Sequence, residues 1–271
     1  MSVRRLIPLA SLLPFALAAA SAPPAGKPEQ IKYRVEVYGP AGLHVATTRT
    51  EIGETADSYT IKARIETRGM AGWFVSMKST AEAHGRLTAD GAQPESFRND
   101  SERNGEERHN KVTYADAGAV SGSSTPPSKA AVKPVAAAQM HGTVDNLTAY
   151  FLLERQLARG GKCDLTVPVF DGQQRYDLRF TDAGQQKLSP KGGQNFAGET
   201  TVCRMKRVEI AGFPAKSEDS EGARSGTLWY ARLVPGDLVQ AVRMEMQTEA
   251  GEISAYLAEV QADGKDLKLM E

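Results

Sequence analysis

The sequence lacks the motifs by which many enzymes are recognised. It has no G-x-S-x-G nucleophile elbow, no H-E-x-x-H metal pair and no glycine-rich phosphate loop. It also lacks an excess of either charge, because 33 lysines and arginines balance 33 aspartates and glutamates. Nucleic acids are bound by concentrated basic faces, so this balance argues against a nucleic-acid partner. It equally provides no polybasic patch for a membrane surface.

Histidine is scarce, and its spacing does not suggest a metal site. The four histidines are His44, His84, His109 and His141. None is paired at the short spacing that builds zinc sites, so we expect solvated histidines, no metal and no cofactor. We also expect no enzymatic activity. A hydrolase assembled from residues distant in the sequence, such as His109, Asp177 and Ser79, stays open as a hypothesis.

No apolar run is long enough to cross a bilayer as a helix, which takes about 20 residues. The first 22 residues, MSVRRLIPLASLLPFALAAASA, place two arginines before a short apolar run that two prolines interrupt. Small residues follow, which completes the pattern of a secretory signal peptide. We predict a signal peptide over 1–20, cleaved near Ala20, and a flexible segment over 21–30. The mature protein is then periplasmic, without a transmembrane span.

Only two cysteines occur, Cys163 and Cys203, and an exported chain would carry both into an oxidising compartment. A redox couple usually has the short C-x-x-C spacing, and a metal pair would need nearby histidines; neither is present. We therefore predict a structural disulfide. Closing a loop of roughly 40 residues restricts the unfolded chain by about 4 kcal/mol on the loop-entropy account.

The dominant hydrophobic period from Ile31 onward is two. Tyr33, Val35 and Val37 alternate with charged residues, and similar alternation recurs along most of the chain. Successive side chains of a strand point to opposite faces, so this pattern predicts antiparallel strands with one wet and one dry face. Asn104-Gly105 and Asp171-Gly172 are strong hairpin signals between such segments.

These segments predict a mainly β fold with a single domain over 31–261 and a C-terminal tail over 262–271. About a dozen strands in sequential hairpins would form one antiparallel meander. Because a flat open sheet of this width is uncommon, we expect strong curvature, as a half-barrel or spiral.

One helix is predicted inside this sheet, over 145–159. Its apolar residues have helical spacing, Asp145 is placed as the N-cap, and Gly160-Gly161 ends it. The apolar residues cover more than half of its circumference, so we expect the sheet to wrap around it. The preceding segment, 117–140, is rich in alanine, serine and proline and predicts a mobile loop, with room for one short edge strand.

Two stretches combine large adaptable apolar side chains with small residues. The first runs from Gly69 to Met77 and continues into small residues on the same strand face; the second is the late pair of strands. Such residues would suit an apolar cavity, and a corner packed against the helix would need the same clearance. The candidate cavity-lining residues are Trp73, Phe74, Met77, Ala81, Ala83, Phe151, Trp229 and Met244.

The order of several short elements resembles a bacterial family, the domain-of-unknown-function family 3108. The elements are Tyr33, Thr67-Arg68-Gly69, Asp90-Gly91 with Pro94 and Phe97, the helix start over 142–149, Val169-Phe170-Asp171-Gly172, Arg175-Tyr176-Asp177-Leu178, Cys203, Ala211-Gly212-Phe213 and Leu228-Trp229. The resemblance covers roughly 31–260 and implies a β-rich envelope protein without an established activity. It also implies a distant likeness to an envelope-integrity family with a spiral sheet, and to lipoprotein carriers whose curved sheet holds acyl chains under a helix.

Two functional hypotheses from different classes follow. In the first, the protein is a monomeric, non-enzymatic binding module for a lipid-like or apolar group, or a partner's exposed segment, in cell-envelope maintenance. In the second, it is a structural or scaffolding envelope protein with a filled core that acts through protein partners. An open apolar cavity between helix and sheet would favour the first hypothesis, and a solid interior the second.

Overall fold

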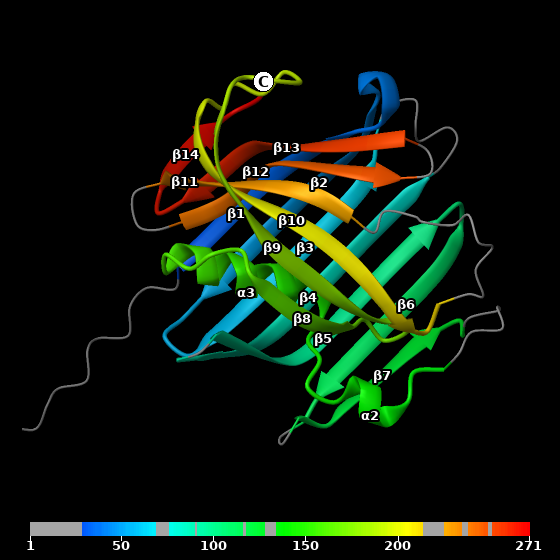
Figure 1. Ribbon diagram of the computed structural model, residues 1–271. Coiled ribbons are helices and arrows are strands. Elements are labelled where there is room, and N and C mark those ends of the chain that lie inside the picture. The colour runs from blue at the N-terminus through cyan, green and yellow to red at the C-terminus, as the bar shows by residue number, and fades with distance from the viewer. Residues whose placement is uncertain are drawn as a thin grey trace, which may run out of the picture.

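The computed structural model describes residues 29–68, 76–89, 91–115, 118–127, 134–213, 225–234, 238–248 and 251–271, and these residues form one 14-stranded antiparallel sheet (Figure 1). The strands are β1 (Glu29–Tyr38), β2 (His44–Glu54), β3 (Ser58–Thr67), β4 (Met77–Thr88), β5 (Gly91–Arg103), β6 (Glu106–Tyr114), β7 (Val120–Thr125), β8 (Leu165–Phe170), β9 (Arg175–Leu188), β10 (Gly198–Ala211), β11 (Ser225–Val234), β12 (Leu238–Thr248), β13 (Gly251–Ala262) and β14 (Lys265–Lys268). The helices are η1 (Pro40–Gly42), α2 (Ala137–Met140) and α3 (Asn146–Ala158).

The sheet is a meander in two halves. Its order is β7-β6-β5-β4-β3-β2-β1-β13-β12-β11-β10-β9-β8, and β14 pairs with β13 beside this path. Neighbours in each half are sequential hairpins, whereas the pairing of β1 with β13 joins the two ends of the domain. Figure 1 shows α3 next to β8, where the chain passes from the blue-to-green first half to the yellow-to-red second half.

The prediction of a mainly β antiparallel meander is confirmed, but that of a strongly curved half-barrel or spiral is not. The sheet is neither strongly curled nor closed, and within the described segments the edge strands β7 and β8 do not pair with each other. The two edges approach through side chains instead: Ser124 of β7 and Arg108 of β6 donate to the side-chain oxygen of Gln173, in the turn after β8, at 3.4 and 3.2 Å. Closure would require backbone hydrogen bonds along both edges, which side-chain contacts do not provide.

The helix prediction is confirmed at both ends, with one addition. Helix α3 begins after the N-cap Asp145 and ends at Ala158, with Arg159 as its C-cap. A second short helix, α2, lies in the segment that the sequence indicated as a loop over 117–140, so the prediction of one helix was incomplete. The same segment holds the short edge strand β7, as the sequence allowed. Four residues are too few for helical periodicity to be visible in a sequence.

The turns and the C-terminus follow local chemistry. Asn104 and Gly105 have positive φ angles of 53° and 81°, as a tight hairpin between β5 and β6 requires. The segment that we treated as a tail, 262–271, contributes β14 and buries Leu269 and Met270. The predicted signal peptide and most of the segment over 21–30 lie outside the described residues.

Two apolar clusters make up most of the core, and the disulfide belongs to the second. The first cluster takes residues from β1–β6 and from β8–β13 and includes Phe151. The second lies around β8–β12 and includes Leu153 and Leu157 from the other side of α3. Cys163 and Cys203 are fully buried there and form the predicted disulfide, with Cα atoms 5.5 Å apart. A disulfide suggests an extracytoplasmic protein. No helix among the described residues is long and apolar enough to cross a membrane.

Candidate functional site

A cavity of about 380 Å³ lies between α3 and both halves of the sheet. Small-molecule sites commonly enclose roughly 300 to 1,000 Å³, so the cavity is large enough for a ligand. Its wall is mainly apolar and comes from three neighbouring strands of the first half, three of the second half and one helix. The lining residues are Tyr33, Val35, Val37, Thr48, Thr50, Ile52, Ile61, Ala63, Ile65, Leu147, Tyr150, Phe151, Glu154, Leu228, Tyr230, Gln240, Ala241, Arg243, Met244, Met246, Ile253, Ala255 and Leu257.

Strand alternation and register place the wall of the first half. Tyr33, Val35 and Val37 occupy one face of β1 because successive side chains point to opposite faces. Tyr33 lies opposite Thr50, which in turn lies opposite Ala63, so all three share that face. From residue 33 to residue 37 the strand advances about 13 Å. The cavity is therefore elongated along β1.

Hydrogen bonds at its N-terminus position α3 against the cavity. The Asp145 carboxylate accepts from the Thr148 backbone N–H at 2.9 Å and from the Thr148 hydroxyl at 2.7 Å. The Tyr59 hydroxyl hydrogen-bonds to the same Thr148 oxygen at 2.8 Å, which ties the helix to β3. Burial raises the pKa of Asp145 to about 6, although the hydrogen bonds from Thr148 oppose that rise.

This anchoring turns one stripe of α3 toward the cavity. Leu147, Tyr150, Phe151 and Glu154 have the spacing of one helix face, and all four line the cavity. The Phe151 ring also stacks on Tyr59, with ring centroids 5.0 Å apart. The helix therefore separates an open apolar space from the filled cluster that contains Leu153.

Glu154 is a carboxyl in this mainly apolar wall. Burial raises its pKa to about 8, and the negative charge of Glu54 adds to the rise, whereas a hydrogen bond from the Gln240 side chain opposes it. The carboxyl is therefore largely protonated at neutral pH. Glu154 also acts electrostatically on Tyr33 and Tyr230, whose hydroxyl pKa values burial raises. Ionisable groups perturbed in this way inside a cleft are common at functional sites.

A second cavity of about 270 Å³ adjoins the first at the C-terminal end of α3. The two share four wall residues: Ile52, Phe151, Glu154 and Gln240. The second cavity is more polar, because Glu54, Arg155 and Arg159 also line it. Arg155 and Glu54 form an ion pair at 2.5 Å. The second cavity is thus the more charged of the two, although Arg243 also lines the first, and its Nη2 donates to the backbone oxygen of Ser189 at 3.0 Å.

The structure places two of the sequence-predicted cavity residues in the wall, Phe151 and Met244. Ala83 is instead fully buried in the filled core, between Ile61 and Phe97 on the neighbouring strands. Trp229 is buried too, and its indole N–H donates to the Gln186 side chain at 2.8 Å. Met77 and Ala81 are partly buried on β4 and do not line the cavity. Trp73 and Phe74 lie outside the described residues.

Sequence reasoning missed most of the wall. The alternation of Tyr33, Val35 and Val37 identified their common face, but nothing in the sequence showed that this face borders an open space. Glu154 was missed although a signal existed. It lies three residues after Phe151 and seven after Leu147, so a charged side chain interrupts an apolar helix stripe.

The hydrolase residues are not brought together. His109 pairs with Asp100 at 2.7 Å on one face of the sheet. Ser79 lies on the opposite face and donates to Asn99, whereas Asp177 pairs with Arg175. In the described part of the chain, no three histidine, cysteine or acidic side chains gather as metal ligands would.

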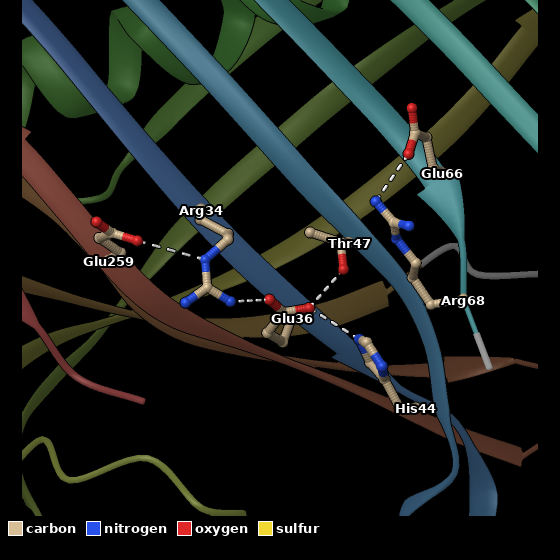
Figure 2. A network of polar contacts seen from close by, with 7 residues as sticks. All are labelled: Arg34, Glu36, His44, Thr47, Glu66, Arg68 and Glu259. Carbon is tan, nitrogen blue, oxygen red and sulfur yellow. Dashed lines mark hydrogen bonds and ion pairs between the residues drawn. The ribbon is translucent and has the colours of Figure 1, made fainter. Parts of the chain in front are cut away.

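A polar network covers the outer face of β1, opposite the cavity (Figure 2). Glu36 is 7% exposed and accepts from Thr47 at 2.6 Å, His44 at 2.8 Å and Arg34. Arg34 also pairs with Glu259 of β13, so the network bridges the two halves of the sheet. Burial acts to raise the pKa of Glu36, but these hydrogen bonds outweigh it and the net pKa is lowered.

Comparison with known proteins identifies a family and a similar fold. The family model for DUF3108, described as a protein of unknown function, matches residues 32–258. No curated protein matches the chain. A crystal structure from Brucella abortus, described as a beta-barrel-like protein of domain of unknown function DUF1849, is similar with a TM-score of 0.50 and 12% identity, over 88% of this chain and 98% of that chain. At this identity the similarity is evidence for the fold alone.

Proposed function

The chain belongs to the DUF3108 family, whose description assigns no activity, and we propose that it is a non-enzymatic binding module for a lipid-like or other apolar group. The open cavity beneath α3 carries this proposal. Protein interiors are normally filled to the density of organic crystals, and unfilled apolar space lowers stability. An apolar space of about 380 Å³ is therefore better explained by an occupant than by packing. The same space favours a binding module over a scaffold with a filled core.

We place this activity in the periplasm, where the protein would act as a monomer in envelope maintenance. The buried disulfide and the signal-peptide pattern over 1–20 support this location. An apolar molecule needs a carrier or a sheltered site in an aqueous compartment, because exposure of its surface to water is unfavourable.

Two measurements test the binding proposal. Native mass spectrometry of protein purified from periplasm should detect a co-purifying apolar molecule. The neutral fluorophore N-phenyl-1-naphthylamine should also bind the purified protein and be displaced by long-chain amphiphiles. Absence of both a co-purifying molecule and fluorophore binding would refute the proposal.

A matched pair of variants locates the binding. Ala63→Phe adds a ring to a residue that lines the cavity and should abolish fluorophore binding. Thr80→Phe adds the same ring at an exposed position on β4 and should leave binding unchanged. Overpacking typically costs about 1 to 3 kcal/mol, which is less than the stability of a typical domain. Circular dichroism should therefore show both variants folded. Equal binding by wild type and Ala63→Phe would place the fluorophore elsewhere and contradict the proposal.

A further inference from the structure

The two adjoining cavities follow one another along β1. The site is more charged at the end near Ile31 and mainly apolar at the end near Val37. Ile31 and Glu54 line the charged cavity, whereas Tyr33, Val35 and Val37 line the apolar one in sequence order. Glu154 and Gln240 border both cavities. A molecule that filled both spaces would therefore need a polar head and a single apolar chain.

Basic groups outnumber acidic ones at the charged end. Arg155 and Arg159 are separated by one helical turn and both line this cavity, together with two acidic residues, Glu54 and Glu154. Glu154 adds little negative charge at neutral pH, because burial raises its pKa to about 8. The lining side chains thus leave one positive charge in excess.

The guanidinium of Arg155 has hydrogen-bonding capacity left over. Its Nη1 donates to Glu54, whereas its Nε is buried and has no hydrogen-bond partner in the described part of the chain. Guanidinium N–H groups form a rigid fork that matches a carboxylate or phosphate. Nε itself has almost no exposed surface, so a ligand would reach the guanidinium through the part of Arg155 that lines the cavity.

The negative end of the α3 dipole does not cancel the preference of this cavity for an anion. Arg232 Nη2 donates to the backbone oxygens of Leu157 and Ala158, which are among the last carbonyls of the helix. These contacts neutralise the carbonyl end that would otherwise repel an anion. Arg159 remains exposed, and its Nη1 donates to the backbone oxygen of Ala89 at 3.3 Å.

We propose that the ligand is a single-chain amphiphile with a carboxylate head, which Arg155 and Arg159 bind while its chain lies in the apolar cavity along β1. This inference rests on the proposed binding function and adds the chemical class and the orientation of the ligand. The single excess charge matches a monoanion. A cationic head would face the same excess charge, and a neutral head would leave it uncompensated.

Three twelve-carbon amphiphiles that differ only in the head group test the inference. Dodecanoate, dodecanol and dodecylamine are titrated at pH 7, below their aggregation limits, against protein loaded with N-phenyl-1-naphthylamine. Dodecanoate should bind about tenfold more tightly than dodecanol, because a charge-assisted hydrogen bond to a partly buried group is worth that factor or more. Dodecylamine should bind most weakly.

Two arginine variants and a control test the orientation. Arg155→Lys keeps the charge opposite Glu54 but removes the planar guanidinium that can bind a carboxylate with two N–H groups, and it should lower dodecanoate affinity about tenfold. Arg159→Gln changes an exposed residue and should lower dodecanoate affinity about threefold. Both variants should leave dodecanol affinity unchanged. Arg64→Gln, at an exposed position of β3, should bind all three compounds as the wild type does.

The outcomes separate the two proposals. Fluorophore displacement by all three amphiphiles with equal affinity, or tightest binding of dodecylamine, would overturn the carboxylate inference and leave the apolar binding site intact. Unchanged head-group selectivity in both Arg155→Lys and Arg159→Gln would also overturn it. Failure of the fluorophore to bind wild-type protein, together with the absence of a co-purifying apolar molecule, would instead refute the binding function itself.

Discussion

Glu154 makes the stability of this protein depend on pH in a direction that is unusual for a carboxyl. Its folded-state pKa is raised to about 8 from the ordinary 4.5, so the folded state holds the proton more strongly than the unfolded chain does. Its contribution to stability is therefore fully present below pH 4.5 and is lost as the pH rises toward 8. Replacing Glu154 with glutamine removes this dependence and keeps a neutral side chain that can hydrogen-bond to Gln240.

The magnitude follows from the pKa. About 2.5 units separate the ordinary value from pH 7, and one unit corresponds to about 1.36 kcal/mol, which gives an upper value of about 3 kcal/mol. Glu154 borders both cavities, so water in them screens part of this cost. We expect the stability of Glu154→Gln relative to wild type to rise by about 1 to 3 kcal/mol between pH 4.5 and pH 7.

Urea unfolding at pH 4.5, 6, 7 and 8 measures this difference by linear extrapolation. Glu199→Gln is the matched control, because Glu199 is exposed on β10; its difference from wild type should not change with pH. A difference between Glu154→Gln and wild type that is constant over this range, or that shrinks as the pH rises, would refute the reasoning.

Three further predictions concern the groups that hold the fold. The double variant Cys163→Ser, Cys203→Ser should lower the free energy of unfolding by about 4 kcal/mol, because the disulfide closes a loop with a sequence separation of 40. In this variant, reductant should no longer affect thermal unfolding. Asp145→Ala removes the N-cap of α3 and should cost about 1 to 2 kcal/mol in urea unfolding, whereas Asp145→Asn should lose less; equal losses would contradict the capping role. Glu36→Gln should cost about 1.5 to 3 kcal/mol at pH 7. Because the folded pKa of Glu36 is lowered, this deficit should begin to shrink as the pH falls below 4.5 and should go on shrinking as the pH falls through the folded pKa; a deficit that stays constant as the pH is lowered would show that the network does not depend on the charge.

Local patterns in the sequence determined much of the fold. Period-two alternation identified the strands, Asn104-Gly105 identified a hairpin, and Asp145 identified the start of α3, because each depends on neighbouring residues alone. The disulfide followed as well, since two cysteines leave a single pairing. The sequence patterns did not show that the sheet stays open. Closure depends on whether two distant edges form backbone hydrogen bonds, and no local pattern records this.

The candidate site was decided mainly by tertiary structure. Periodicity shows which side chains share a strand face, and it identified the face of Tyr33, Val35 and Val37 correctly. Whether that face meets other side chains or an open space depends on the distance between two halves of the sheet far apart in the sequence. The same holds for Glu154 of α3, whose raised pKa arises from burial and from Glu54, a residue of strand β2. Alternation is a property of the chain, whereas volume and dielectric environment are properties of its packing, and only the folded structure determines them.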